Sequence, residues 1–339
     1  MKTCIYTLAN DVVLDQLIAL LNSIEVNVGS DFPVRVVAYS DPLDKVREEV
    51  RSRKNVELLE AHELFLPWEE FSKKAWANNS YAQKVWREKG VSGVYRLASN
   101  HRYFAFDQKS DFEKFIYFDA DVLVLNPIDF IIEKLDEYQF VTYDFQYKDP
   151  GHIYNLNSPR LFEIFPESRI RSEIFCAGCF AGRRGLFSEQ ERNWIIDKLQ
   201  SGEGEILYPS APNQSLLNYM KMRLNLESYN FALELDSSKK TGNSVTSSHF
   251  QCRDNILYDK GERLTYLHYI GLPAQLFTRL CQGENIDFPY RDLFLYYRYL
   301  KNPEQRPVLK GSPKSLNSSS SFFQKINRKF TRFIKRFSS

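Results

Sequence analysis

The sequence has no long hydrophobic run. No apolar stretch approaches the roughly 20 residues that a helix needs to cross a bilayer. The N-terminus, MKTCIYTLAND, has one lysine and only a short apolar run before polar residues, so it does not resemble a secretory signal peptide. We therefore predict a cytoplasmic chain without a membrane-spanning helix.

An excess of charge is also missing. The chain has 45 lysine and arginine residues against 43 aspartate and glutamate residues, a formal net charge of +2 at pH 7. This balance gives no reason to expect a nucleic-acid partner. Cysteines are few as well. There are five, and an odd number fits a reducing compartment better than a disulfide framework.

Two of the cysteines, Cys176 and Cys179, form a CxxC pair. Such a pair can bind zinc or carry thiol redox chemistry. No second CxxC accompanies it, and the segment around it is apolar and typical of a strand. We therefore interpret both as structural cysteines, with the zinc and redox interpretations as alternatives.

The chain does contain enough apolar material for a large core, since 43% of its 339 residues are hydrophobic and 15% are aromatic. At its start, strand-like and helix-like patterns alternate. We predict strands at 3–9, 33–39 and 56–59 and helices at 12–26 and 44–53. This order predicts an α/β fold with a mostly parallel sheet and helices on both faces. A GxGxxG motif is absent, so any nucleotide is held differently from a dinucleotide.

The stretch KFIYFDADVLVL, residues 114–125, carries the main candidate for chemistry. The run from Phe115 to Phe118 predicts a buried strand, and it stops at Asp119 and Asp121. Two carboxylates this close repel each other in a low dielectric, so they indicate a bound cation or a solvated cleft. Mg²⁺ and Mn²⁺ prefer such oxygen ligands. The alternative is a strand end whose aspartates cap the next turn.

Residues 92–107, which precede this strand, have the pattern of a helix. On such a helix Arg96 and Asn100 would share a face, because they are four residues apart. Arg96 could then reach a phosphate or a ribose, or be a plain surface cation. Its spacing does not separate these possibilities.

An ordered series of motifs resembles family 8 of the glycosyltransferases, which contains glycogenin and bacterial lipopolysaccharide galactosyltransferases. The resemblance runs from about residue 3 to about residue 275. Its elements, in chain order, are Thr7-Leu8-Ala9-Asn10-Asp11, Tyr95-Arg96-Leu97, Phe118-Asp119-Ala120-Asp121, Ala177-Gly178, Asn213-Gln214 and His268-Tyr269-Ile270-Gly271. The Asp-x-Asp element is a poor identifier alone, and its place in the series makes it specific.

The resemblance implies a GT-A fold, a UDP-linked nucleotide-sugar donor, and transfer with retention of anomeric configuration. It implies that Asp119, Asp121 and His268 hold Mn²⁺ or Mg²⁺. It further implies a nucleotide-sugar site and a catalytic set. The nucleotide-sugar site consists of Leu8, Ala9, Asn10, Arg96, Ala177, Gly178 and Gly271, and the catalytic set of Gln214, Asp144 and Asn213.

Three positions depart from the family pattern. The family has a lysine where this chain has Ala274, an asparagine where it has Cys176, and an aspartate where it has Asn213. Each change removes a polar or charged contact to sugar, diphosphate or acceptor. Arg279 and Lys260 are candidates to supply the missing positive charge.

The last part of the chain changes character. We predict a body over 1–309, a serine-rich linker over 310–321 and a basic amphipathic helix over 322–339. Phenylalanines alternate with lysines and arginines in FFQKINRKFTRFIKRF, a pattern typical of a helix that lies on an anionic membrane surface. The alternatives are a basic tail that binds nucleic acid or one that packs on the body.

The predicted function is metal-dependent sugar transfer to a glycan or lipid-linked acceptor at the cytoplasmic membrane face. Two other classes remain open. One is a non-catalytic nucleotide-sugar-binding or membrane adaptor protein, which the three departures favour. The other is a haloacid-dehalogenase-type phosphatase, because a strand followed by Asp-x-Asp also describes its active site. That family usually has the motif near the N-terminus and a Thr or Gly just after it, whereas Val122 follows here.

Overall fold

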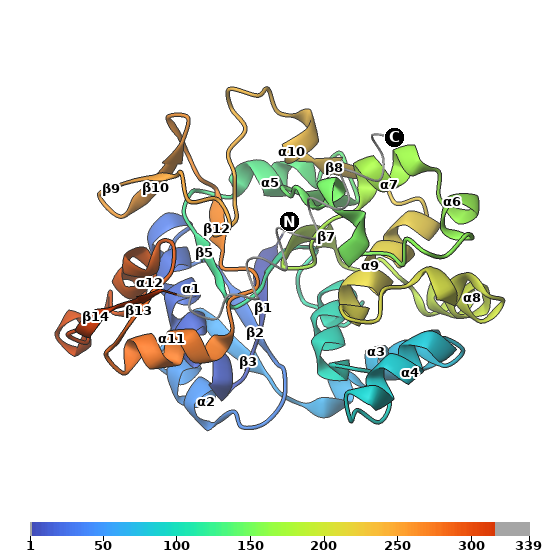
Figure 1. Cartoon of the computed structure of the whole chain (residues 1–339), viewed down its shortest axis with the longest axis horizontal. Coiled ribbons are helices and arrows are strands. Elements are labelled where there is room, and N and C mark those ends of the chain that lie inside the picture. Colours follow the sequence, from blue (N-terminus) through green and yellow to red (C-terminus); the bar gives the residue numbers. More distant parts are fainter. Residues whose placement is uncertain (1, 316–339) are drawn as a thin grey trace.

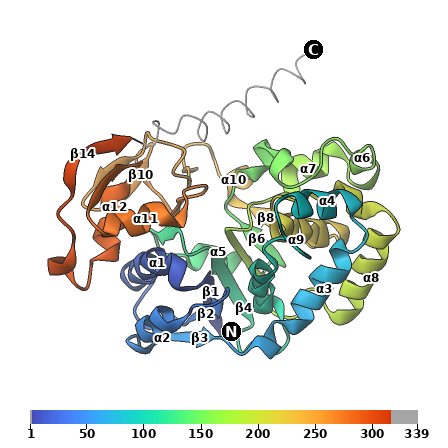
Figure 2. The same ribbon diagram turned by 60° about the horizontal axis from the view of Figure 1, so that its bottom comes forward.

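A computed structural model describes residues 2–315 (Figures 1 and 2). The predicted helix over 322–339 and linker residues 316–321 lie outside the described residues. Within the described part, no helix is both long enough and apolar enough to cross a membrane.

A seven-stranded sheet forms the centre of the molecule, in the order β3-β2-β1-β4-β7-β6-β8. All neighbouring strands pair in parallel except β7, which is antiparallel to both β4 and β6. This mixed, mostly parallel sheet confirms the predicted fold class. The strands are β1 (Thr3–Ala9), β2 (Val34–Ala38), β3 (Val56–Leu59), β4 (Lys114–Phe118), β6 (Phe140–Thr142), β7 (Cys179–Arg183) and β8 (Ser228–Asn230).

Helices lie on both sides of this sheet, and Figures 1 and 2 show α1 on one side and α3 on the other. Their apolar faces join the strands in one large core, because burying both sheet faces requires cover on both. The helices of this part are α1 (Leu14–Asn27), α2 (Asp44–Arg51), α3 (Leu66–Trp76), α4 (Ser80–Glu88), α5 (Asp129–Lys134), α6 (Leu161–Ile164), α7 (Glu167–Glu173), α8 (Glu189–Gln200), α9 (Pro212–Arg223) and α10 (Phe231–Glu234).

The prediction of a helix over 92–107 is wrong in two respects, namely the kind of helix and the residue at which it begins. The segment Leu97–Phe106 is a 3₁₀ helix, and Arg96 precedes it in the left-handed region with φ 54°. Arg96 and Asn100 therefore share no helical face. Every residue from Ser99 to Phe106 is buried. The segment packs between the sheet and α3, and burial on all sides overrides the amphipathic pattern.

The C-terminal elements form a second core against α1. Figure 2 shows them side by side with that helix. They are α11 (Ala274–Cys281), β13 (Glu284–Asp287), α12 (Arg291–Arg298) and β14 (Lys310–Ser315), next to a small antiparallel sheet of β9 (Gln251–Arg253), β10 (Ile256–Asp259) and β11 (Glu262–Arg263).

The first residues of the predicted linker, 310–315, form the strand β14. This strand pairs in parallel with β13, and Lys310 N donates to Gly283 O at 3.0 Å. Residues 310–314 are exposed, and besides the backbone pairing the strand is held by Lys314 Nζ on Glu284 Oε1 and by Asn285 Nδ2 on Gly311 O, each at 2.7 Å. A polar, serine-containing strand of this kind has no apolar pattern by which the sequence could reveal it.

Candidate functional site

A short two-stranded pairing brings distant parts of the chain together beside the central sheet. β4 ends at Phe118, and β5 (Val122–Val124) pairs with β12 (Tyr266–His268) so that Val122 faces His268. The amide of Tyr269 donates to Asp121 O at 2.9 Å and extends this pairing. The turn between β4 and β5 therefore carries both aspartates next to His268.

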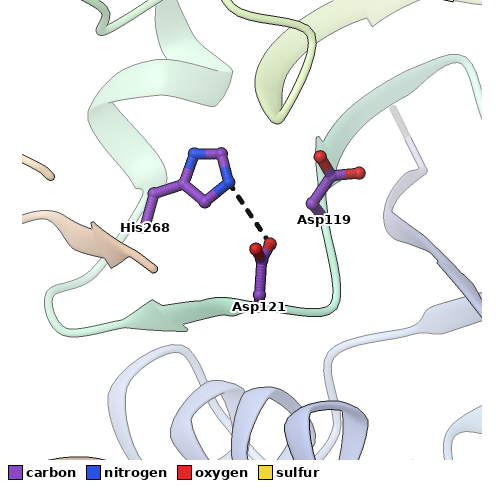
Figure 3. Close-up of side chains that lie close together, drawn as sticks. All are labelled: Asp119, Asp121 and His268. Atoms are coloured by element: carbon purple, nitrogen blue, oxygen red, sulfur yellow. Dashed lines mark ion pairs between the residues drawn. The ribbon is translucent and has the colours of Figure 1, made fainter. Parts of the chain in front are cut away.

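Asp119, Asp121 and His268 form a group that can hold a metal ion. One ligand atom from each lies within 4.8 Å of the others. The Nε2 atom of His268 is 3.2 Å from Asp121 Oδ1, and Figure 3 shows Asp119 across from both. The structure thus brings together all three metal ligands that the resemblance implies. Carboxylate oxygens with one imidazole suit a divalent cation such as Mn²⁺ or Mg²⁺.

Because His268 and Asp121 lie close together, each changes the pKa of the other. Burial opposes the charged imidazole, but the carboxylate of Asp121 outweighs burial and raises the pKa of His268 well above its ordinary value. For Asp121, burial acts to raise the pKa, but the charge and hydrogen bond of His268 lower it below its ordinary value. Without a metal, the pair therefore consists of an imidazolium and a carboxylate at neutral pH.

We expect the apparent affinity for Mn²⁺ to rise with pH, because the cation must displace the proton of His268. The gain is up to about tenfold per pH unit below the raised pKa of His268, and it levels off above that pKa. Calorimetric titration at pH 6, 7 and 8, in buffers of different ionisation enthalpy, measures affinity and proton release together. His62→Asn, which removes an exposed histidine outside the group, should keep the slope. An affinity that is flat with pH, with no proton released, would contradict the expectation.

Arg102 belongs to the site, although its spacing in the sequence does not mark it. Its guanidinium is buried, lies 3.2 Å from Asp119 Oδ1 and stacks on the ring of Tyr117, with 4.7 Å to the ring centroid. It also donates to Ala177 O at 2.6 Å. The hydroxyl of Tyr117 donates to the same Asp119 oxygen at 2.7 Å. Asp119 is thus held from two sides, and its orientation toward His268 is set by groups that precede it.

The loop before β7 forms one wall of the site. Asp119 N donates to Gly178 O at 2.9 Å, which ties the aspartate turn to this loop. A Cβ atom on Gly178 would lie 2.3 Å from His268 Cε1 and 3.1 Å from Asp119 Oδ2. Only glycine therefore leaves room for the imidazole at this position.

Gln214, in the first turn of α9, faces the same loop. Its Oε1 accepts from Ala177 N at 2.9 Å, and its Nε2 donates to His152 O at 3.3 Å. Asn213, its neighbour, is 7% exposed, and its backbone oxygen accepts from the hydroxyl of Tyr103. These contacts hold the start of α9 against the loop before β7 and against the 3₁₀ helix that carries Tyr103.

These side chains surround a cleft with a volume of about 620 Å³. Most of the predicted site residues line it. They are Leu8, Asn10, Arg96, Asp119, Asp121, Ala177, Gly178, Asn213, Gln214, His268 and Gly271. Sequence reasoning missed Tyr39, Gln16 and Arg102, which also line it. Each lies on a different element, and no motif spacing connects them.

Two predicted residues do not line the cleft. Ala9 is fully buried in β1, and its carbonyl accepts from Tyr39 N at 2.9 Å. Asp144 follows β6 and is 7% exposed, with Oδ1 accepting from Gln146 N at 2.7 Å. Burial raises the pKa of Asp144 to about 6. Ala9 can therefore affect a ligand in the cleft only through the position of its backbone. Asp144 lies deeper in the protein than the residues that line the cleft.

The departures from the family pattern can now be placed. Cys176 lines the cleft, and burial raises the pKa of its thiol as well as that of Cys179, so both are poor thiolates. Ala274 also lines the cleft. Arg279 instead makes a bidentate pair with Glu284 at 2.6 Å, and Lys260 points to Ser237 O at 3.4 Å. Neither Arg279 nor Lys260 is among the lining residues.

No protein-family model and no curated protein matches the sequence. Similar solved structures include several glycosyltransferases, the kind of protein to which the sequence resemblance points. Mouse xyloside xylosyltransferase 1 in its apo form is 9% identical, with a TM-score of 0.49 over 70% of this chain and 86% of that chain. The galactosyltransferase LgtC, in complex with donor and acceptor sugar analogues, is 13% identical, with a TM-score of 0.48 over 86% and 99%. GlyE of Streptococcus pneumoniae TIGR4 is 14% identical, with a TM-score of 0.45 over 92% and 66%.

Proposed function

We propose that this chain is a metal-dependent, retaining glycosyltransferase that moves a sugar from a UDP-sugar to a glycan or lipid-linked acceptor. One observation carries the proposal. Asp119, Asp121 and His268 meet in a cleft at the carboxyl ends of β1 and β4, where ligands of open α/β sheets bind. Apart from Ala9, the residues that the resemblance implies for a nucleotide-sugar line the same cleft.

The chemistry of the site suits a diphosphate leaving group. A divalent cation, when bound, neutralises the diphosphate charge and polarises the glycosyl–phosphate bond. Asp119 and Asp121 supply the oxygen ligands, and Arg102 with Tyr117 keeps Asp119 in place. The fixed orientation costs no reorganisation when the bond breaks, which is the general basis of electrostatic catalysis.

The β1 side of the cleft fits the nucleoside. Leu8, Val12 and Tyr39 supply an apolar wall on which a uracil can pack. The Oε1 atom of Gln16 is buried in this lining and has no hydrogen-bond partner among the described residues. A buried acceptor without a partner is costly, so it favours a ligand that brings a donor such as a ribose hydroxyl or an N–H of the base. Asn10 caps the turn that shapes this wall.

The opposite side of the cleft fits the sugar and the transition state. Gln214 is held by Ala177 and His152, and its amide oxygen is an electrostatic partner for an oxocarbenium-like centre. Ala177 and Gly178 leave space next to it, and Asn213 adds a polar neighbour. We assign Asp144 an indirect role behind this wall, because it is buried and bonded to Gln146.

The test is release of UDP from a panel of UDP-sugars with and without Mn²⁺. We expect the purified chain to release UDP from one or a few members of the panel, and only with the metal. Binding of UDP without any release across the panel would favour the non-catalytic alternative. Release of inorganic phosphate from phosphate monoesters, with fluoride-complex labelling of Asp119, would favour the phosphatase.

We also propose that residues 322–339 bring the chain to an anionic membrane surface, where a lipid-linked acceptor would lie. The proposal rests on the sequence alone, in which phenylalanines alternate with basic residues.

Truncation after Ser315, which keeps β14 intact, should release the chain from vesicles that contain phosphatidylserine. Each basic residue near such a surface contributes about 1 kcal/mol, so we expect binding to fall by at least about 100-fold. Co-sedimentation with anionic and neutral vesicles measures it, and UDP release serves as the folding control. Unchanged co-sedimentation of the truncated chain would contradict the proposal.

A further inference from the structure

A second hollow, which we call the α3–α8 groove, lies where α3 packs against α8. Its volume is about 520 Å³, within the range of sites that bind small ligands. Residues of both helices line it, together with residues of two chain segments, 106–109 and 185–188. None of these residues lines the cleft of the metal group, so the two hollows are separate.

The lining of the groove combines aromatic and polar side chains. Phe71, Phe106 and Phe187 supply its apolar part. Gln108 and Asn193 are exposed and carry amide groups, which both donate and accept hydrogen bonds. A sugar needs both kinds of surface, because its C–H groups pack on apolar atoms while its hydroxyl groups bond to polar ones. The composition of the groove therefore suits a sugar.

Arg192 is a half-buried cation in this groove. Its guanidinium lies over the ring of Trp68, with 4.4 Å to the ring centroid, and its Nη1 donates to Phe187 O at 3.1 Å. Within the described part of the chain it makes no ion pair. Burial lowers the pKa of Arg192 below its ordinary value, and the charges of Asp107 and Glu189 oppose this only in part. The fold therefore leaves much of this charge without compensation.

Most of the hydrogen-bonding capacity of Arg192 is open to a ligand. A guanidinium has five N–H donors. One of them is directed at Phe187 O, and the side chain makes no other hydrogen bond to a described residue. Trp68 contacts the face of the guanidinium and not its edge. The planar fork can therefore still bind two oxygens of a carboxylate or a phosphate.

Two lysines add to the positive charge of the groove. Lys74 and Lys109 are exposed, line the groove and make no ion pair with any residue that the structure describes. Of the three carboxylates in the lining, Glu70 pairs with Lys73 at 2.8 Å, which leaves two. The three cations of the lining exceed these two carboxylates by one charge, which favours an anionic ligand.

The backbone of Phe187 is strained at the same place. Its φ of 64° lies in the left-handed region, which a bulky side chain rarely adopts. Strain of this kind is concentrated at binding and catalytic sites. Here it accompanies the contact between the carbonyl of Phe187 and the guanidinium of Arg192. The strained turn thus helps to hold the guanidinium at the groove.

We infer that the α3–α8 groove binds a sugar that carries a carboxylate or a phosphate, and that Arg192 is the ligand of this anionic group. The sugar packs on the aromatic part of the lining, and the two lysines attract its charge. That such a sugar is a unit of the acceptor glycan rests on the proposed function. The binding itself does not, because it needs neither the metal nor the donor.

The experiment measures binding of four probes by calorimetry, without added metal. Glucuronate and glucose 6-phosphate carry the two anionic groups, glucose carries neither, and inorganic phosphate lacks the sugar. The variants are Arg192→Met, which keeps an apolar chain on Trp68 without the charge, and Arg192→Lys. Arg87→Gln removes an exposed arginine of α4 that does not line the groove, and it controls for net charge. Thermal unfolding controls for folding.

We expect the wild type to bind at least one of the two anionic sugars at least about tenfold more tightly than glucose or inorganic phosphate. Arg192→Met should weaken that binding by about 10- to 100-fold, because a charged pair of hydrogen bonds is lost. Arg192→Lys should retain part of the affinity, since it keeps the charge without the fork. Arg87→Gln should bind like the wild type.

A further variant covers the case in which Arg192→Met fails to fold. Lys109→Gln changes an exposed residue of the groove and should weaken the anionic sugar by about two- to fivefold, the effect expected of an exposed charge. An excess of UDP with Mn²⁺ should not displace the sugar, because no residue lines both hollows.

Three results would overturn the inference. The first is that neither anionic sugar binds more tightly than glucose and inorganic phosphate. The second is that both Arg192→Met and Lys109→Gln bind like the wild type, and the third is that UDP with Mn²⁺ displaces the sugar, which would place it in the cleft. The proposed function fails separately. A chain that binds an anionic sugar through Arg192 but releases no UDP from any UDP-sugar keeps this inference and loses the transferase.

Discussion

Gly178→Ala is expected to abolish both metal binding and UDP release. The new methyl group would lie 2.3 Å from His268 Cε1, far inside van der Waals contact, and 3.1 Å from Asp119 Oδ2. The imidazole cannot give way easily, because His268 is only 8% exposed and its backbone is paired with β5. A displacement of about 1 Å is enough to cost about 100-fold in activity, and we expect at least that loss in Mn²⁺ affinity and in turnover.

Gly151→Ala is the matched control. A Cβ atom at Gly151 would meet Asp149 Oδ1 at 3.4 Å and Leu156 Cδ1 at 3.6 Å, which are ordinary contacts. This variant should keep wild-type Mn²⁺ affinity and activity. Calorimetry measures the Mn²⁺ affinity of both variants, and an assay of UDP release measures their activity. Circular dichroism shows whether each variant is folded. A folded Gly178→Ala protein that binds Mn²⁺ like the wild type would show that His268 does not ligate the metal.

Asp121→Asn is expected to abolish metal-dependent turnover while the fold remains intact. The amide has the shape of the carboxylate but lacks its charge, so it is a far weaker ligand for a hard cation. It also removes the partner that raises the pKa of His268. Loss of one electrostatic group of this kind typically costs 10²- to 10³-fold, and we expect a fall of about that size in UDP release with saturating donor.

The loss should be accompanied by a change in the pH dependence of metal binding. In the wild type the raised pKa of His268 makes the proton compete with the cation at neutral pH. In Asp121→Asn that competition is weaker, so the remaining weak affinity for Mn²⁺ should vary less with pH between 6 and 8. Asp31→Asn removes an exposed aspartate far along the chain from the group and should behave like the wild type. Equal turnover by Asp121→Asn and wild type would remove the metal from the proposed mechanism.

Local patterns in the sequence were sufficient for the first half of the sheet. The bounds of β1 and β3 agree with the prediction to the residue, and β2 differs by one residue at each end. Those segments are short apolar runs between polar caps, which leaves little freedom in how they are assigned, although only β1 and β2 are mostly buried and the edge strand β3 is not. The aspartate turn after β4 was predictable for the same reason, since a charged pair at the end of a buried strand has few structural explanations.

Other features depend on contacts between distant residues, and the sequence alone did not disclose them. Arg102 contacts Asp119 and Ala177, which lie in later segments of the chain, and no local pattern in the sequence marks it. The 3₁₀ helix before β4 and the polar strand β14 were missed because tertiary packing and backbone pairing decide them. Neither mechanism leaves a periodic pattern in the side chains.

By itself, then, the sequence determined the mostly parallel sheet and the position of two aspartates at its edge, because burial of apolar residues is encoded locally in their spacing. The short distance between His268 and Asp121 and the ion pair between Arg102 and Asp119 were decided only by the tertiary structure. The physical reason is that an ion pair or an unpaired charge depends on which groups lie within a few ångströms. Chain folding sets those distances between residues far apart in sequence.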